Sequence, residues 1–135
     1  MPASHLLDTN ILSHLIKHPQ GVATARLAAL GADAVCTSII VACELRYGAA
    51  KRASPALSQR VEALLDRLPI LPLDSEADRH YGEIRATLER EGQIIGGNDL
   101  LIAAHCRTLD LTLVTDNLRE FQRVPDLRVE NWLAD

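Results

Sequence analysis

The chain has 135 residues, a length that suits one domain, and 47% of them are hydrophobic. Only 3% are aromatic, so the core must be aliphatic, and an aromatic platform for stacking nucleic-acid bases is disfavoured. A net charge of −4 argues against general binding of phosphate backbones, but four acids used as metal ligands would leave equal numbers of acidic and basic groups.

Five short apolar runs alternate with longer segments of helical periodicity. Strands separated by helices predict an α/β fold with a mostly parallel sheet covered on both faces. Because no linker or repeat interrupts the pattern, residues 1–135 are expected to form a single domain. The predicted strands are His5–Leu7, Ala34–Thr37, Ile70–Leu73, Thr112–Thr115 and Leu127–Val129.

Apolar residues between these runs recur at helical spacing. Pro55 suits the start of a helix, and Gly31 and Gly92 suit helix ends. The stretch Leu100–Ala104 is apolar on all sides, which predicts a helix buried in the core. The two clearest helical patterns are Leu57, Val61, Leu64, Leu65 and Leu68, and Ala77, Tyr81, Ile84 and Leu88.

Four acidic residues lie within or beside apolar segments. They are Asp8 in LLDTN, Glu44 in VACELRYG, Asp99 in GGNDLLIAAH and Asp116 in LVTDN. Ligands of open parallel sheets bind beyond the carboxyl ends of the strands, and Asp8 and Asp116 follow the first and fourth predicted strands. If those strands are neighbours, the two carboxylates meet at one edge of the sheet.

Each acid also has a plain structural interpretation. Asp8 could cap the following helix, Asp99 could cap the helix that it begins, and Asp116 with Asn117 could form a turn. Glu44 is harder to explain in this way. It lies mid-helix among apolar residues, where a charge is costly to bury unless it is paired or bound to a metal.

A shared site explains the four acids together. Two carboxylates about 4 Å apart repel by about 4 kcal/mol at an effective dielectric of ~20, and a divalent cation removes that repulsion. All-oxygen ligands select Mg²⁺ or Mn²⁺ rather than Zn²⁺. Such ions activate water and stabilise the charge that develops when a phosphodiester is cleaved, so the acids predict hydrolytic chemistry on a phosphodiester.

The segments LLDTN, ELRYG, IIGGNDLLIAAH and TLVTDN, with YGEIR and REF, resemble the successive motifs of PIN-domain nucleases. Their order and spacing are most similar to VapC-type toxins, and the resemblance runs from His5 to Trp132. It implies a three-layer α/β/α fold and a Mg²⁺- or Mn²⁺-dependent endoribonuclease, with metal ligation by Asp8, Asp99 and Glu44. It also implies an RNA substrate, often tRNA, a VapB-type antitoxin and a homodimer.

The chain departs from the family pattern at the fourth acid. Many PIN domains place it last in a T-x-D motif, and here that position is Asn117. Either Asp116 replaces it, or the fourth acid is dispensable and Asn117 holds a water. A rival interpretation from another class is a non-catalytic metal-binding or protein-interaction module, whose acidic pocket recognises a cationic segment or holds a structural ion.

Several further side chains carry expectations about the site. Ser38 is expected to orient a ligand, and His105 to lie on a helix face. The pair Gly96–Gly97 is expected to let the backbone turn tightly so that Asp99 enters the site. Candidates for phosphate contact, each with a solvated helix face as the simpler explanation, are Arg46, Arg85, Arg107 and Arg119.

The remaining expectations concern surfaces and location. A homodimer would pair apolar helix faces that include Leu27 and Leu30, or Val61 and Leu65. The sequence contains no run of about 18 apolar residues and no signal-like N-terminus, which predicts a cytoplasmic protein without a membrane span. Three cysteines in apolar surroundings predict small buried side chains and no disulfide framework: Cys36, Cys43 and Cys106.

Overall fold

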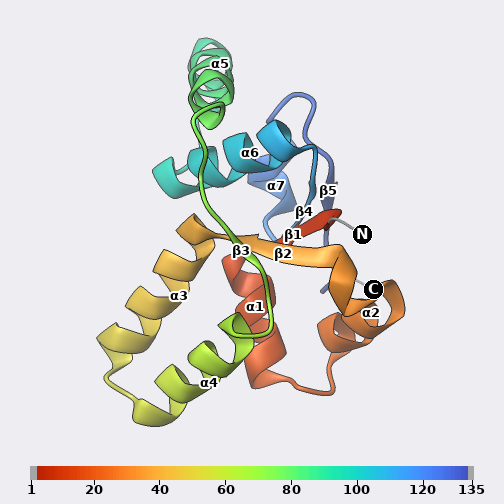
Figure 1. Cartoon of the computed structure of the whole chain (residues 1–135). Helices are drawn as coiled ribbons and strands as arrows, with labels where there is room; N and C mark the ends of the chain where they lie inside the picture. The colour runs from red at the N-terminus through yellow and green to blue at the C-terminus, as the bar shows by residue number, and fades with distance from the viewer. Residues whose placement is uncertain (1–2, 134–135) are drawn as a thin grey trace.

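Five parallel strands form one sheet in the order β3-β2-β1-β4-β5 (Figure 1). This architecture comes from a computed structural model, which describes residues 3–133. Each predicted strand overlaps an observed one, and the α/β fold class is confirmed. The strands are β1 (His5–Leu7), β2 (Val35–Ser38), β3 (Ile70–Leu71), β4 (Thr112–Val114) and β5 (Val129–Glu130).

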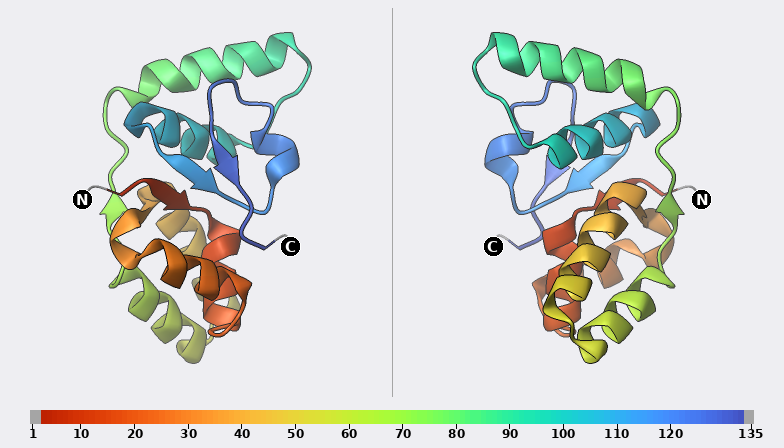
Figure 2. Two further views of the ribbon diagram at one scale, coloured as in Figure 1. Left: turned by 90° about the vertical axis from the view of Figure 1, so that its right-hand side faces the viewer. Right: turned by 90° about the vertical axis from the view of Figure 1, so that its left-hand side faces the viewer.

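Helices cover both faces of the sheet and complete a three-layer α/β/α arrangement. In Figure 1, α1 to α4 lie below the sheet and α5 and α6 lie above it, and both side views of Figure 2 show the same layers. The longer helices are α1 (Thr9–Lys17), α2 (Val22–Leu30), α3 (Ile39–Arg52), α4 (Pro55–Leu65), α5 (Ala77–Arg90) and α6 (Gly97–Leu109), and two short ones are η1 (Ala32–Ala34) and α7 (Leu118–Phe121).

Local chemistry explains where several helices begin and end. The hydroxyl of Ser54 accepts a hydrogen bond from the Leu57 N–H, and Pro55 takes the first helical position of α4. Gly31 follows α2 with φ = 101°, and Gly92 follows α5 with φ = 67°. These are conformations that side chains disfavour, so both predicted helix ends are confirmed.

The core is aliphatic, as the composition predicts. Leu6 and Leu7 of β1, Leu113 and Val114 of β4, and Ile102 of α6 are completely buried. The central strands β1 and β4 are therefore buried on both faces, as parallel strands between two helical layers should be. Among the described residues, no helix has both the length and the apolar composition needed to cross a bilayer.

Two surface expectations need correction. Cys36 and Cys106 are buried as predicted, but Cys43 is exposed, because its position on α3 faces away from the sheet. Val61 and Leu65, expected on a dimer face, are each only 3% exposed because α4 packs them against the core of its own chain. They are therefore not available to a second copy.

A buried hydrogen bond joins the helices that carry Glu44 and Asp99. The hydroxyl of Ser38 caps α3 by accepting from the Ile40 N–H, and it lies 2.8 Å from Nδ1 of His105 on α6. His105 lies on α6 as expected, and it is 1% exposed, so its face of the helix is turned into the protein. Ser38 acts on the site only indirectly, by fixing the start of α3.

Replacing Ser38 with alanine is expected to lower the free energy of unfolding by about 2–4 kcal/mol. The loss of the cap costs about 1 kcal/mol, and the buried Nδ1 of His105 loses its partner at a further cost of about 1–3 kcal/mol. Urea denaturation measures the change. Ser54→Ala is the matched control, because it removes only a cap and should cost about 1 kcal/mol; equal losses in the two variants would contradict the role given to the buried pair.

Candidate active site

The strand order places the carboxyl ends of β1 and β4 at a switch point of the sheet. From β1 the sheet extends through β2 to β3, and from β4 it extends the other way to β5. Leu7 is in register with Val114, and the Asp8 N–H donates to the Val114 carbonyl at 2.9 Å. The predicted adjacency of the first and fourth strands is thus confirmed, and ligand sites of open α/β sheets form at such points.

Asp8 is the most buried of the acids, with 7% of its surface exposed. One carboxylate oxygen accepts from the Thr9 N–H at 2.8 Å and so caps α1, as the structural interpretation expected. The other oxygen accepts from the Thr115 hydroxyl at 2.9 Å. Burial raises the pKa of Asp8, and the nearby charges of Glu44 and Asp116 raise it further, against the lowering effect of the two hydrogen bonds.

Glu44 enters the site from α3 on the same side. Its Oε1 accepts a 2.6 Å hydrogen bond from the Thr9 hydroxyl, and its Oε2 accepts a 3.4 Å hydrogen bond from the Asn98 amide. The side chain is half-buried and has neutral donors on both oxygens. Val41, Ala42 and Leu45 are buried in the core, whereas Glu44 itself bonds to Thr9 and Asn98 at the acidic edge of the sheet.

Asp99 lies in the first turn of α6, and its cap interpretation is wrong. The helix begins at Gly97 with Gly96 as its N-cap, and no side chain caps it. Burial raises the pKa of Asp99 to about 7, together with a hydrogen bond to Glu120 and the charges of Asp8, Glu120 and Glu44. A buried carboxyl group with other acids close to it is typical of a site with surplus negative charge.

Glu120 was not singled out from the sequence, although it contacts Asp99. It lies on α7, the short helix that follows β4 in the chain, and its Oε2 accepts from the Asn117 amide at 3.0 Å. Asn117 thus orients an acid. The rule that drew attention to Asp116, an acid just beyond the carboxyl end of a strand, does not extend to Glu120, because β4 ends at Val114 and α7 begins only at Leu118.

Asp116 occupies the rim of the site. Its side chain is exposed, and its Oδ1 accepts from the Asn10 amide at 3.0 Å. Its charge raises the pKa of Asp8 but is not among the groups that act on Asp99. The fold therefore brings Asp8, Glu44 and Asp99 together with Glu120, and leaves Asp116 at one side.

The donor set fits a hard divalent cation. All its charged members are carboxylates, their hydrogen-bond donors are neutral, and no cation is among the groups that shift the pKa of Asp8 or Asp99. Within residues 3–133 no three His, Cys, Asp or Glu side chains already surround one point closely enough to hold an ion. Binding therefore requires the acidic side chains to move closer together. Each carboxylate retains lone pairs for an ion such as Mg²⁺.

Replacing Thr115 with valine is expected to weaken metal binding by about 10- to 100-fold. Thr115 is fully buried and fixes the Asp8 carboxylate, and groups that orient a ligand in this way commonly have effects of that size. Valine keeps the shape of the side chain but removes the hydroxyl. Calorimetric titration with Mn²⁺ measures the change, and unaltered affinity in a folded variant would show that Thr115 does not position the ligand.

Two further expectations are corrected by the geometry. Gly96 has φ = −60°, which any residue can adopt, so no tight glycine turn admits Asp99; a Cβ on Gly96 would lie 3.6 Å from Asp99 Oδ2, an ordinary contact. Three of the four arginines considered for phosphate contact form ion pairs within the chain: Arg46 with Glu62, Arg85 with Glu89, and Arg107 with Glu83.

Comparison with known proteins assigns this site to a family. The family model for the PIN domain matches residues 5–127, which include all five acids of the site and its rim. The chain belongs to the PIN-domain family. The predicted resemblance is confirmed. PIN-domain ribonucleases depend on divalent metal ions, in agreement with the donor set.

Curated relatives of this PIN domain are ribonucleases. Ribonuclease VapC2 of Haemophilus influenzae is 43% identical over 96% of this chain and 98% of its own. The tRNA(fMet)-specific endonuclease VapC of Salmonella typhimurium is 40% identical over 94% of this chain and 96% of its own. The expectation that this PIN domain is an endoribonuclease of the VapC type, a hydrolase, is confirmed.

Solved structures agree. VapBC2 of Rickettsia felis, bound to a DNA fragment from the promoter, matches with a TM-score of 0.88 and 37% identity over 95% of this chain and 98% of that chain. VapBC-5 of Mycobacterium tuberculosis, a member of the VapBC family of toxin–antitoxin systems, matches with a TM-score of 0.69 and 27% identity over 96% of this chain and 98% of that chain. The predicted toxin–antitoxin relationship is therefore confirmed for the family of this PIN domain.

Proposed function

We propose that the protein is a toxin that cleaves RNA with Mg²⁺ or Mn²⁺ held by Asp8, Glu44, Asp99 and Glu120. The observation that carries the proposal is the gathering of these acids beyond the adjacent carboxyl ends of β1 and β4, where their hydrogen-bond donors are neutral and no cation compensates them. A bound divalent ion would supply an activated water and neutralise charge on the scissile phosphate. Asp116 remains a candidate for an assisting role at the rim.

The remaining residues of the site act by orientation. Thr9 donates its N–H to Asp8 and its hydroxyl to Glu44, so one residue fixes two of the acids relative to each other. Thr115 fixes the second oxygen of Asp8, and Asn117 fixes Glu120. Because these donors are neutral, they hold the carboxylates without cancelling the charge that attracts the cation.

The substrate that we propose is tRNA, cut to leave a 3′-hydroxyl and a 5′-phosphate. The proposal rests on relatives at about 40% identity over nearly the whole chain, one of which is named as specific for tRNA(fMet). Such a substrate places the enzyme in the cytoplasm, and the three cysteines are unpaired thiols, as a reducing compartment requires.

A VapB-type antitoxin is the proposed partner. The similar structures are VapBC complexes, and a peptide that presents an arginine or lysine to the four carboxylates would neutralise them as a metal ion does. We also propose that residues 1–135 form one domain that assembles as a homodimer. Since Val61 and Leu65 are buried, the apolar face on α2 with Leu27 and the exposed Leu30 is the remaining one of the two predicted faces.

The experiment that tests this function is a survey of RNA 5′ ends after induction of the protein in cells without its antitoxin. Wild type should produce new ends concentrated in tRNA, and Asp8→Asn should not. A folded wild type that produces no new ends would favour the rival non-catalytic binding module, whose acidic pocket would bind a cation or a basic peptide without turnover.

A further inference from the structure

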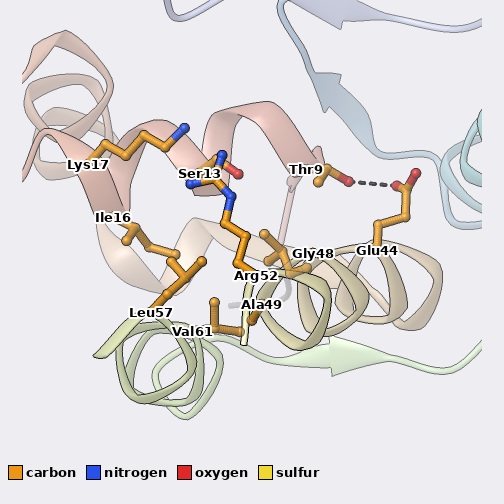
Figure 3. Close-up of a pocket in the computed structure, with 11 residues that line it drawn as sticks. Thr9, Ser13, Ile16, Lys17, Glu44, Gly48, Ala49, Arg52, Leu57 and Val61 are labelled. Atoms are coloured by element: carbon orange, nitrogen blue, oxygen red, sulfur yellow. Dashed lines mark hydrogen bonds between the residues drawn. The ribbon is translucent and has the colours of Figure 1, made fainter. Parts of the chain in front are cut away.

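A groove leads away from the acidic site between α1 and α3. It opens into a pocket of about 200 Å³ over the side of α4. Two rows of residues four apart face each other across it, as Figure 3 shows. The rows are Thr9, Ser13 and Lys17 on α1, and Glu44, Gly48 and Arg52 on α3. The other residues that line the pocket are apolar: Ile16, Leu45, Ala49, Leu57 and Val61.

The charge of the groove changes from acidic at one end to basic at the other. At one end the Thr9 hydroxyl binds Glu44, and eight residues further along each helix, about 12 Å at ~1.5 Å per residue, stand Lys17 and Arg52. Midway, a Cβ added to Gly48 would meet nothing within 4 Å, so the groove is open there. In Figure 3 the Arg52 side chain extends from α3 toward Ser13 on α1, and Lys17 lies at the end of α1 away from Thr9 and Glu44.

The basic end continues into a second pocket of about 510 Å³. Lys17 lines both pockets, and the second adds Arg60 and Arg67 from the α4 side, with no acidic residue in its lining. We call the four cations Lys17, Arg52, Arg60 and Arg67 the basic groove. None of them forms an ion pair with another described residue, whereas four arginines elsewhere do: Arg46, Arg85, Arg107 and Arg128.

We propose that the basic groove binds the sugar–phosphate backbone of the RNA on one side of the bond that is cut. The proposal rests on the proposed function and extends it to the surface that holds the substrate. Lys17 and Arg52 would contact a phosphate a few nucleotides from the scissile one, and Arg60 and Arg67 would contact those beyond. Unpaired cations in a line are the usual means of positioning such a backbone.

The charge pattern favours RNA over a peptide as the occupant. The basic groove leads from four cations to the acidic site, where a divalent ion would bind another phosphate. RNA carries a negative charge at every nucleotide along that path. An acidic peptide could pair with the cations but would meet Glu44 and the other carboxylates at the far end. No aromatic residue lines either pocket, so the contacts are with the backbone and carry no base preference.

Binding of fluorescently labelled bulk tRNA in EDTA tests the proposal without cleavage. The double variant Lys17→Gln/Arg52→Gln should bind roughly 10-fold more weakly at 0.15 M salt, and the slope of log affinity against log salt should fall by about 1.5, close to 0.7–0.9 per cation. The matched control is Arg79→Gln/Arg90→Gln, which removes two charges from α5 on the opposite layer and should leave both quantities unchanged.

Cleavage kinetics with Mg²⁺ separate this proposal from the proposed function. The basic-groove variant should raise KM roughly 10-fold with little change in kcat at saturating tRNA, because the acids remain intact. Unchanged tRNA affinity and salt slope in that variant, with an active wild type, would overturn the groove alone. If wild type binds a ten-residue glutamate peptide, and the basic-groove variant loses that binding but still binds tRNA as wild type does, the occupant of the groove is an acidic protein segment and not RNA. A wild type that neither binds nor cleaves tRNA would overturn both proposals.

Discussion

Substituting Asp99 with asparagine is expected to reduce RNA cleavage by at least about 10³-fold while leaving the fold intact. Asp99 contacts Glu120 and lies near the charges of Asp8 and Glu44. A cation bound by Asp99 would therefore neutralise the repulsion among several acids. Loss of several kcal/mol of charge stabilisation corresponds to three or more powers of ten in rate. Single-turnover cleavage of tRNA measures the effect.

The control and the neighbouring acids sharpen this test. Asp33→Asn makes the same chemical change on the exposed η1 helix, away from the sheet edge, and should cleave at the wild-type rate. Glu120→Gln should lose much more activity than Asp116→Asn, because Glu120 contacts Asp99 whereas Asp116 bonds to Asn10 at the rim. The reverse order would identify Asp116 as the fourth acid.

Mg²⁺ is expected to raise the melting temperature of the wild type by roughly 8–15 °C at 100 times its dissociation constant. A ligand at that concentration stabilises by about 2.7 kcal/mol, and each kcal/mol moves the midpoint of a domain of this size by a few degrees. Asp99→Asn should gain much less, because it lacks one ligand. Thermal unfolding of both proteins in EDTA and in Mg²⁺ measures the difference.

The stability of the metal-free protein is expected to depend on pH, and the raised pKa of Asp99 determines the direction of the change. Its pKa is about 7 in the folded protein against 3.8 ordinarily, so between these values the folded state binds more protons than the unfolded state. Metal-free wild type should therefore lose stability from this group as the pH rises from about 4 to about 7. Metal-free Asp99→Asn should melt higher than wild type at pH 8, with the gap closing toward pH 4. Identical curves for the two proteins would leave these acids without a shared site.

The sheet and most of the acid cluster could be predicted because both depend on local pattern. Short apolar runs between helices specify a parallel sheet, and an acid directly after a strand, such as Asp8, must lie at its carboxyl edge. Glu44 could be recognised because a charge among apolar neighbours has few explanations. Placing Asp8 and Asp116 at one edge required only that the first and fourth strands be neighbours, and the register of Leu7 with Val114 confirms this.

The parts that could not be predicted depend on tertiary packing. Glu120 lies on a helix of four residues, too short to show periodicity, so nothing in the pattern pointed it toward Asp99. The apolar positions Val61 and Leu65 look alike whether they face the core or a second copy, and only the packing of α4 on its own chain decides between them. The basic groove likewise joins Lys17 to Arg52 across two helices whose approach the sequence does not specify.

Chelation and restoration of cleavage test the central claim most directly. Purified wild-type protein should cut tRNA in Mg²⁺, stop in excess EDTA, and recover when Mg²⁺ or Mn²⁺ is returned. Asp99→Asn, folded by circular dichroism, should remain inactive in all three conditions. Undiminished cleavage in EDTA, or equal cleavage by folded Asp99→Asn, would contradict a metal-dependent nuclease site built from these carboxylates.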